Sequence, residues 1–393
     1  MRTEEIQTPF YLVREDLLEE NIRGFKAALE ETWPGSIPAY SVKTNALPWI
    51  LQRMREEGVR AEVVSDEEYE LAKLCGYGDG EIIFNGPSKS PEKAGEALTK
   101  GAIVNLDSRR ELDHIRREKP ELRGSIGLRI NMDPRTFDAG DAGYLEDGFR
   151  FGFSEERGGL EEALEALREV YGGIRIGLHL HVNSATRSPG VYRTLARYAR
   201  QLIRRHGIDP AFIDAGGGFF GGVPGKATPK EYITGIREEL EGAVDFARTP
   251  LIIEPGSAFI ASAVELHTTV TDVKDTCLSR IVTTDGSRLY SDPLWVKKSY
   301  LMTTTSRRAP VEKQVVCGFT CMDHDRITVL RNEPELAEGD RIVYHRVGNY
   351  SVTFGGPFIR PFPAVYAGRD GEARLIRRVM TMDEYYRMEM ANT

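Results

Sequence analysis

The central segment of this sequence reads Pro38-Ala39-Tyr40-Ser41-Val42-Lys43-Thr44-Asn45, a short apolar run that ends in one lysine. Lysine is depleted from protein interiors, because removing its ammonium from water is costly unless the charge is paired or neutralised. A lysine at the end of a strand therefore either reaches solvent or acts as an amine. Schiff-base formation is the leading chemistry of such an amine.

Short apolar runs alternate with charged segments of helical spacing over the first two thirds of the chain. The segments 66–74, 91–98, 160–170 and 230–240 have apolar residues at helical intervals. Eight strand–helix alternations favour a (β/α)₈ barrel over an open doubly wound sheet. The eight predicted strands are 37–42, 61–64, 82–84, 102–106, 124–130, 174–182, 211–213 and 251–253.

The pattern changes after the eighth run. Short β-branched runs between turn residues follow, at 268–270, 280–283, 314–316 and 341–344. They predict a separate β-domain, a barrel or sandwich, which the β-like N-terminal run 8–13 is expected to join. The predicted domains are therefore a barrel over 22–262 and a β-domain made of 1–21 and 263–393.

Composition is that of a globular protein, with 28% charged and 40% hydrophobic residues among 393. The net charge of −8 argues against nucleic-acid or anionic-membrane partners. The N-terminus lacks the pattern of a signal peptide, and no apolar run approaches the ~20 residues of a membrane span. The four cysteines are too few and too irregular for a disulfide framework or zinc site, so a cytoplasmic location is expected: Cys75, Cys277, Cys317 and Cys321.

Polar residues gather at the predicted strand ends, where barrel enzymes carry their reactive groups. Such a set is hard to explain as core packing. Its members are Lys43, Ser65, Asn85, Arg129, His181, Gly216 to Gly218 and Glu254.

A run of glycines follows the seventh strand, in Asp214-Ala215-Gly216-Gly217-Gly218-Phe219. Glycines let backbone N–H groups approach and surround a phosphate, and barrels favour phosphate sites after strands seven and eight. A flexible turn is the alternative. The run is not a Rossmann fingerprint, because it comes late in a barrel pattern.

Two histidines, His179 and His181, are predicted on one face of the sixth strand. Metal ligation is one interpretation, but no third ligand is evident, and the alternatives are a structural pair or a ring that stacks on a ligand. Glu254 ends the eighth strand before Pro255-Gly256, either as a functional carboxylate or as a surface turn. An amine, a phosphate site, a flat histidine and a carboxylate together suit pyridoxal 5′-phosphate, and no metal is expected.

The sequence here resembles the barrel-type (fold type III) pyridoxal-phosphate decarboxylases, which include diaminopimelate and ornithine decarboxylases. AYSVKTN is similar to the family's lysine motif, GLHLHVNS to its sixth-strand motif, DAGGGF to its phosphate loop and EPG to its carboxylate motif. The resemblance implies a role for each matching residue. These are the Schiff-base lysine Lys43, the ring-stacking His181, Ser184 and Gly216 to Gly218 at the phosphate, Glu254 at the pyridine nitrogen, and Arg129 near the ring hydroxyl.

The resemblance extends into the predicted β-domain. CGFTCMDHD resembles a segment that carries a catalytic cysteine and an aspartate four residues later, here Cys321 and Asp325. GNYSVTFGGPF resembles a segment in which a tyrosine contacts the phosphate and an aromatic residue lines the pocket, here Tyr350 and Phe358. The family also implies a homodimer whose active sites are shared, with Cys321 reaching the partner's barrel.

Four positions depart from the family pattern. Met322 follows the cysteine where Asp or Glu is common, and Ser257 follows EPG where arginine is common. Glu62 stands where aspartate is common, and Asn183 replaces a glycine. Because a thioether offers no charge to a distal amine, these changes argue against free lysine, ornithine or meso-diaminopimelate as substrate.

We therefore expect a cytoplasmic amino acid decarboxylase that acts on a modified or conjugated amino acid, in siderophore or antibiotic biosynthesis. Lys43, Cys321, Glu254 and His181 are the expected catalytic residues, and Cys321 the proton donor. Met322, Asp325, Phe358 and Ser257 are expected at the substrate, with Arg360 as a further candidate. The long loop 131–154 is expected to close over it. The alternatives are a racemase or epimerase on the same scaffold and a noncatalytic pyridoxal-phosphate-binding protein.

Overall fold

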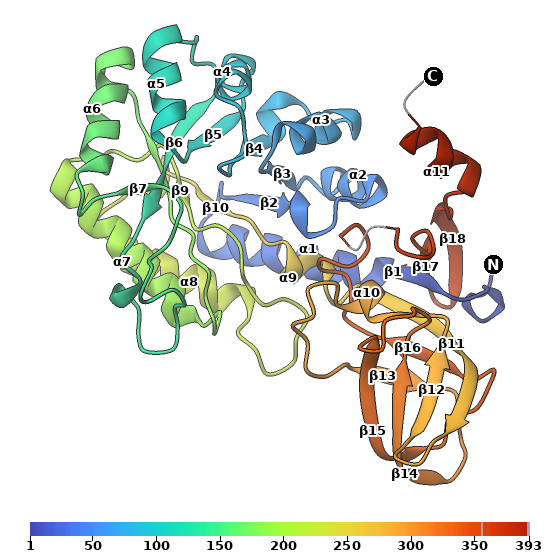
Figure 1. Cartoon of the computed structure of the whole chain (residues 1–393). Helices are drawn as coiled ribbons and strands as arrows, with labels where there is room; N and C mark the ends of the chain where they lie inside the picture. Colours follow the sequence, from blue (N-terminus) through green and yellow to red (C-terminus); the bar gives the residue numbers. More distant parts are fainter. Residues whose placement is uncertain (355–356, 391–393) are drawn as a thin grey trace. The chain divides into compact units, whose positions relative to one another are not determined.

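The structure is a computed structural model that describes residues 1–354 and 357–390. The chain divides into two compact units (Figure 1). Asn21–Phe259 forms the barrel unit, and Met1–Glu20 with Ile260–Thr393 forms the β unit. The two boundaries fall within helices α1 (Glu15–Thr32) and α9 (Ser257–Ile260).

Eight parallel strands close into a ring in the barrel unit, in the order β5-β4-β3-β2-β10-β9-β8-β6, and β6 pairs back with β5. Each predicted strand overlaps one of these eight, so the (β/α)₈ barrel prediction is confirmed. A short ninth strand, β7, pairs with the end of β6. The strands are β2 (Ile37–Ser41), β3 (Arg60–Val63), β4 (Ile82–Phe84), β5 (Ile103–Leu106), β6 (Ser125–Asn131), β7 (Phe153–Ser154), β8 (Gly177–His179), β9 (Ile213–Asp214) and β10 (Leu251–Ile253).

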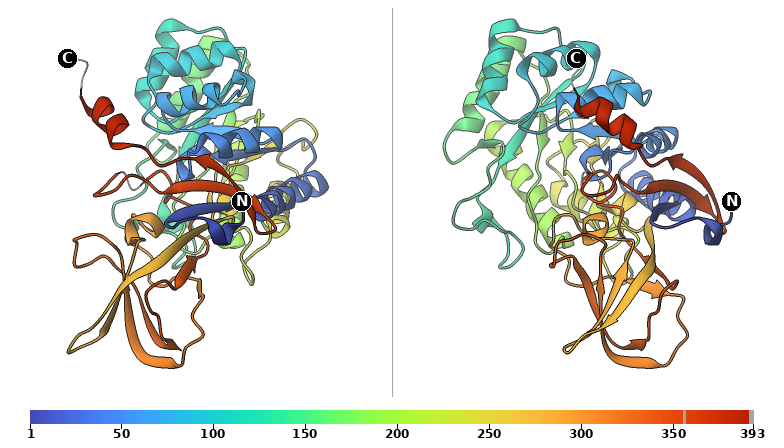
Figure 2. Two further views of the ribbon diagram at one scale, coloured as in Figure 1. Left: turned by 90° about the vertical axis from the view of Figure 1, so that its right-hand side faces the viewer. Right: turned by 45° about the vertical axis from the view of Figure 1, so that its right-hand side comes forward.

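Helices surround the barrel strands (Figures 1 and 2). Three of them begin at a serine or threonine followed by proline: the hydroxyls of Ser90, Ser188 and Thr228 accept the N–H of the third helical residue. This combination satisfies a free N–H and presets the first helical φ. Besides α1 and α9, the helices described in this unit are α2 (Pro48–Glu56), α3 (Asp66–Leu74), α4 (Pro91–Lys100), α5 (Arg109–Glu118), α6 (Gly159–Tyr171), α7 (Pro189–His206) and α8 (Pro229–Leu240), with 3₁₀ turns at Val42–Thr44, Asp79–Glu81 and Pro134–Thr136.

The interior of the barrel contains an apolar cluster built around Phe212. Its ring occupies space left by two glycines, since a Cβ at Gly177 would lie 2.1 Å from the ring and one at Gly127 would lie 2.7 Å from it. The other members of the cluster are Ala39, Ile83, Ile103 and Ile252. Polar residues lie instead near the carboxyl ends of the strands, where the candidate site is found.

The β unit is a nine-stranded sheet in which the N-terminal strand takes part. β1 pairs antiparallel with β11 and parallel with β17, so the prediction that the N-terminal strand joins the β-domain is confirmed. The four predicted runs lie in β11, β12, β14 and β16. The elements are β1 (Phe10–Arg14), β11 (Val264–Asp275), β12 (Arg280–Thr284), β13 (Met302–Thr304), β14 (Pro310–Cys317), β15 (Arg326–Pro334), β16 (Arg341–Tyr344), β17 (Ala364–Arg369), β18 (Glu372–Arg377), α10 (Arg288–Ser291), α11 (Met382–Glu389) and a 3₁₀ turn at Thr3–Glu5.

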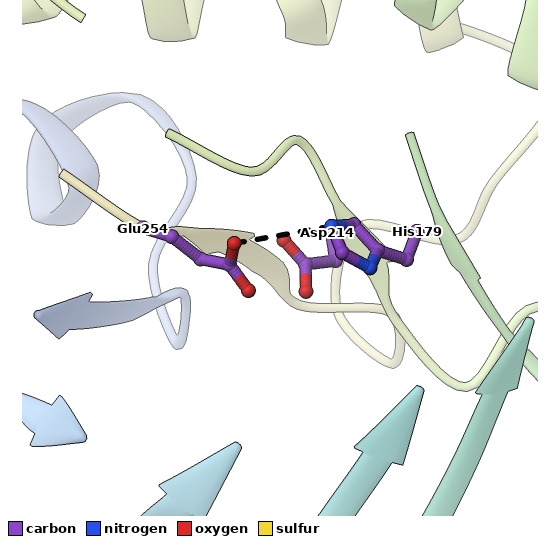
Figure 3. A group of neighbouring side chains, drawn as sticks. All are labelled: His179, Asp214 and Glu254. Atoms are coloured by element: carbon purple, nitrogen blue, oxygen red, sulfur yellow. Dashed lines mark ion pairs between the residues drawn. The ribbon is translucent and has the colours of Figure 1, made fainter. Parts of the chain in front are cut away.

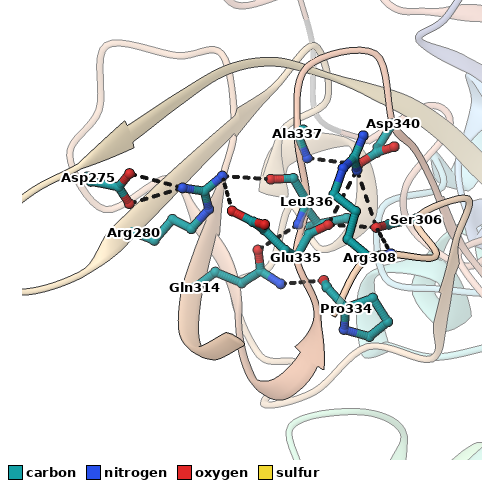
Figure 4. A network of polar contacts seen from close by, with 10 residues as sticks. All are labelled: Asp275, Arg280, Ser306, Arg308, Gln314, Pro334, Glu335, Leu336, Ala337 and Asp340. Carbon is teal, nitrogen blue, oxygen red and sulfur yellow. Dashed lines mark hydrogen bonds and ion pairs between the residues drawn. The ribbon is translucent and has the colours of Figure 1, made fainter. Parts of the chain in front are cut away.

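A polar network fastens β12, β14 and the end of β15 to the segment that follows (Figure 4). Arg280 contacts both carboxylate oxygens of Asp275 at 3.0 Å and one of Glu335 at 2.9 Å. The buried Gln314 donates to the carbonyl of Pro334 at 2.7 Å and accepts the Leu336 N–H at 3.0 Å. None of the helices within residues 1–354 and 357–390 combines the length and apolar character needed to cross a membrane.

Candidate active site

Lys43 lies in a 3₁₀ turn directly after β2. Its Nζ donates to Ser41 Oγ at 2.7 Å and to Glu62 Oε2 at 2.8 Å. The Lys43 side chain is 43% exposed, whereas the Glu62 side chain is 1% exposed. A buried carboxylate on the neighbouring strand therefore holds a reachable amine at the carboxyl end of the barrel.

Two asparagines connect three buried carboxylates across the strand ends. Asn85 Nδ2 donates to Glu62 Oε1 at 3.1 Å and to Glu254 Oε1 at 2.6 Å. Asn105 Nδ2 donates to Asn85 Oδ1 at 2.8 Å and to Asp214 Oδ2 at 3.0 Å. The network fixes the orientation of Glu254 and links it, through Asn85 and Glu62, to Lys43.

The surroundings of this network shift its proton affinities. Burial, together with the nearby Asp214 and Glu62, raises the pKa of Glu254 well above its usual value. Burial also raises the pKa of Asp214, to about 6, and burial and the Arg129 guanidinium lower the pKa of His179 well below its usual value. The buried Glu254–Asp214 pair thus retains a proton that an exposed pair of carboxyls would lose, and His179 is neutral.

His179, Asp214 and Glu254 form a compact buried group (Figure 3). Their potential ligand atoms lie within 4.8 Å of one another, and His179 Nε2 is 3.8 Å from Glu254 Oε2. These donor types also occur in metal sites. Lys43 and Arg129, however, bring positive charge to this group, since both act on the pKa of His179. The absence of a metal stays a prediction.

The glycine loop lies against His181. A Cβ at Gly216 would lie 2.5 Å from His181 Cβ, and Gly216 has a φ of +64°, so this position requires glycine. The Gly217 N–H donates to His181 Nδ1 at 3.3 Å, and Arg129 Nη2 donates to the His181 carbonyl at 2.7 Å. Because β8 ends at His179, His181 lies beyond the strand, and the prediction of both histidines within the sixth strand was wrong.

These residues fit pyridoxal 5′-phosphate. Lys43 supplies the amine, and the left-handed Gly216 and Gly218 open a backbone loop of the kind that binds phosphate. The Glu254 carboxyl, held by Asn85, could accept the N–H of a protonated ring nitrogen through its ionised form. Among the described residues, the buried ring nitrogens of His179 and the Nε of Arg129 have no hydrogen-bond partner. These atoms can therefore still form hydrogen bonds with a bound ligand.

The predicted serine residues have local roles in the structure. Ser184 Oγ accepts the Arg187 N–H at 2.8 Å, and Ser65 Oγ accepts the Glu68 N–H at 3.2 Å, which caps α3. Ser257 is half-buried at the first position of α9. The roles of Ser184 toward the phosphate and of Ser257 toward the substrate stay predictions.

Five predicted site residues lie in the β unit. Cys321 is exposed, Met322 and Tyr350 are half-buried, and Phe358 is 43% exposed. Asp325, by contrast, is only 2% exposed. The roles of these residues at the cofactor and the substrate stay predictions.

The Asp325 carboxylate faces its own loop. It accepts the hydroxyls of Ser287 at 2.9 Å and Thr320 at 2.7 Å, and the Arg288 N–H at 2.8 Å. These bonds fasten the loop that carries Cys321 to the start of α10. They indicate a positioning role for Asp325 rather than a free carboxylate for a substrate.

Sequence reasoning missed the roles of several buried polar residues. Asn105 and Asp214 were not predicted at the site, and Glu62 was noted only as a departure from the family pattern. Asn105 lies in β5 one residue before its end, and Asp214 is the last residue of β9. The rule that reactive groups gather at the strand ends therefore held a signal for both.

The family model described as "Pyridoxal-dependent decarboxylase, pyridoxal binding domain" matches residues 16–261. The chain belongs to the pyridoxal-dependent decarboxylases. Pyridoxal 5′-phosphate is accordingly its cofactor, and the protein is a pyridoxal-phosphate-dependent amino acid decarboxylase.

Relatives of this decarboxylase extend over both units. Diaminopimelate decarboxylase from Archaeoglobus fulgidus is 27% identical over 367 residues, which cover 90% of this chain and 86% of the relative. L-glutamyl-[BtrI acyl-carrier protein] decarboxylase from Niallia circulans is 26% identical over 408 residues, 97% of this chain and 94% of the relative. The crystal structure of diaminopimelate decarboxylase from Helicobacter pylori complexed with L-lysine matches with a TM-score of 0.80 at 26% identity, covering 98% of each chain.

Proposed function

We propose that this decarboxylase acts on an amino acid that carries no free distal ammonium, that is, on a modified or conjugated amino acid. The observation that carries the proposal is Met322, a half-buried thioether next to the exposed Cys321. The resembled enzymes commonly have a carboxylate at this position. An ammonium brought against a thioether would lose water without gaining a partner.

Two further observations support this substrate class. Ser257 replaces the arginine that commonly follows the EPG motif, so a second charged contact to the side chain of the substrate is also missing. The Niallia circulans relative is named as a decarboxylase of a glutamyl group attached to an acyl-carrier protein. A conjugate of this kind suits a biosynthetic step toward a siderophore or an antibiotic.

Lys43 and Glu62 prepare the amine for chemistry. At rest, Glu62 pairs with the Lys43 ammonium at 2.8 Å, and in our proposal it accepts a proton from that ammonium when Lys43 binds the cofactor aldehyde. When bound, pyridoxal phosphate supplies the electron sink that stabilises the negative charge left on the α-carbon by loss of CO₂. Glu254, oriented by Asn85, holds a proton at the ring nitrogen.

The remaining roles belong to the predicted positioning and proton-transfer residues. Gly216 to Gly218 bind the phosphate together with Ser184 and Tyr350, and His181 stacks on the ring. Cys321 donates the proton that returns to the α-carbon. We further propose a homodimer in which Cys321 of one subunit completes the site of the other, and a cytoplasmic location.

Neither alternative function has an observation in its favour. The relatives that cover most of this chain are named decarboxylases, which argues against a noncatalytic binding protein. No observation favours a racemase.

Measurement of CO₂ release from a panel of amino acids tests the proposal. The panel contains lysine, ornithine and meso-diaminopimelate beside their distal N-acylated counterparts. We expect turnover of the acylated compounds to exceed that of the free diamines by at least tenfold in kcat/KM. Met322→Glu should move this preference toward the free diamines, whereas efficient turnover of the diamines by the wild type would refute the proposal.

A further inference from the structure

A cavity of about 550 Å³ lies within the barrel unit beside the candidate cofactor site. Arg129 and His181 line it from the cofactor side. The loop between β6 and β7 lines it as well, through Tyr144, Phe149 and Arg150. The volume is ample for an amino acid side chain of several atoms.

Arg150 is the cation of this cavity to which neither the family resemblance nor the proposed mechanism gives a role. Its guanidinium lies over the ring of Phe151, 4.3 Å from the ring centroid. Arg150 is exposed, and among residues 1–354 and 357–390 it forms no ion pair, although Asp147 also lines the cavity and the buried Asp107 interacts with Arg150 at longer range. The guanidinium therefore keeps its capacity for an anionic partner.

The backbone on both sides of Arg150 is fastened to the barrel. Asn131 Nδ2, at the end of β6, donates to the carbonyls of Phe149 at 2.6 Å and Phe151 at 2.7 Å. Two residues later, β7 begins and pairs with β6. A guanidinium on an anchored backbone, stacked on a ring, loses little freedom when it binds a ligand.

We propose that this cavity binds the distal end of the substrate and that Arg150 recognises a carboxylate there. The inference rests on the proposed function, and it makes the substrate side chain anionic rather than merely free of an ammonium. The lining carries two guanidiniums, Arg129 and Arg150, against one carboxylate, Asp147. Outside the lining, the buried Asp107 also interacts with both guanidiniums, but burial raises the pKa of this carboxyl, which favours its uncharged form, so the charge of the lining still favours an anion. The planar fork of arginine matches the two oxygens of a carboxylate.

Three pairs of amino acids that differ by one distal charge provide the probes. They are L-glutamate, L-2-aminoadipate and L-2-aminopimelate, each compared with its distal amide. Binding to the holoenzyme is followed through the visible absorbance of the cofactor, and CO₂ release is measured in parallel. For the pair of best-fitting length, we expect the wild type to bind the acid at least tenfold more tightly than the amide.

Arg150→Gln should reduce this preference to within twofold, and Arg150→Lys should retain part of it. Arg135→Gln is the matched control, because Arg135 lies in the same loop but pairs with Asp133. Equal binding of acid and amide by the wild type, or an unchanged preference in a cofactor-loaded Arg150→Gln, would overturn the inference. If the charge preference holds while no compound of either panel releases CO₂, the inference stands and the proposed function fails.

Discussion

Replacement of Gly216 by alanine probes the contact between the glycine loop and His181. Gly216 has a φ of +64°, and a left-handed backbone costs a residue with a Cβ about 1–2 kcal/mol. The new Cβ would also lie 2.5 Å from His181 Cβ, so His181 must move, at a further cost of ~1–3 kcal/mol. We therefore expect a total loss of roughly 2–5 kcal/mol in the free energy of unfolding.

Gly207→Ala is the matched control. Gly207 follows α7 with a φ of +60°, and a Cβ there would meet nothing within 4 Å. This variant should lose only the free energy that the left-handed backbone costs a residue with a Cβ, about 1–2 kcal/mol. Urea unfolding of the cofactor-free protein measures both values, and absorbance titration with pyridoxal phosphate measures cofactor affinity.

Cofactor affinity decides whether the contact matters for function. If His181 stacks on the ring, its displacement should weaken binding of the cofactor by roughly fivefold to 150-fold in Gly216→Ala, which corresponds to the ~1–3 kcal/mol of the contact. Gly207→Ala should bind the cofactor as the wild type does. Equal affinities in the two variants would refute the assignment of His181 and the glycine loop to the cofactor site.

Three further predictions concern the catalytic residues. Borohydride reduction of the holoenzyme should fix the cofactor to the peptide that contains Lys43, as mass spectrometry would show, and a label on another lysine would contradict the assignment. Because burial beside two other carboxylates raises the pKa of Glu254, the native cofactor-free protein retains a proton that the unfolded chain releases. Its free energy of unfolding should therefore fall as pH rises from about 4.3 through the raised pKa. In urea unfolding, Glu254→Gln should make this dependence of stability on pH less steep, and the variant should also have a lower kcat. An unchanged dependence of stability on pH would contradict the raised pKa. Lys43→Ala and Cys321→Ala, each nearly inactive alone, should recover roughly a quarter of wild-type activity when refolded together at equal amounts, because mixed dimers would contain one intact site. No recovery in mixed dimers that have demonstrably formed would exclude the shared site.

The barrel and the catalytic strand ends could be predicted because both follow from local pattern. A parallel strand buried on both faces gives a short apolar run, and its carboxyl end gives the place of a reactive residue. This rule led to Lys43 and Glu254, which the structure places just after β2 and β10, and their catalytic roles stay predictions. The bonds of Asn85 to Glu62 and Glu254 could not be predicted in this way, because they depend on how neighbouring strands align and which way each side chain points.

The β unit was harder to predict for a related reason. β15 begins Arg326-Ile327-Thr328-Val329-Leu330-Arg331 and is exposed along much of its length. An exposed strand does not need to alternate apolar and polar residues strictly, so the pattern that reveals a half-buried strand is weak here. Motif order led to the loop around Cys321, whose role at the site stays a prediction, but it could not show that the Asp325 carboxylate turns inward.

The residues that we propose to select the substrate are held by side-chain contacts, which a sequence pattern does not reveal. Chemistry common to the family lies at strand ends, whose positions follow from the barrel itself. The Cys321 loop and the loop that carries Arg150 are instead held by a few side-chain bonds, from Asp325 in one case and Asn131 in the other. Loss of either anchor should therefore alter substrate choice while the Lys43–Glu62 pair stays intact, and this explains why sequence motifs predict the reaction class more readily than the substrate.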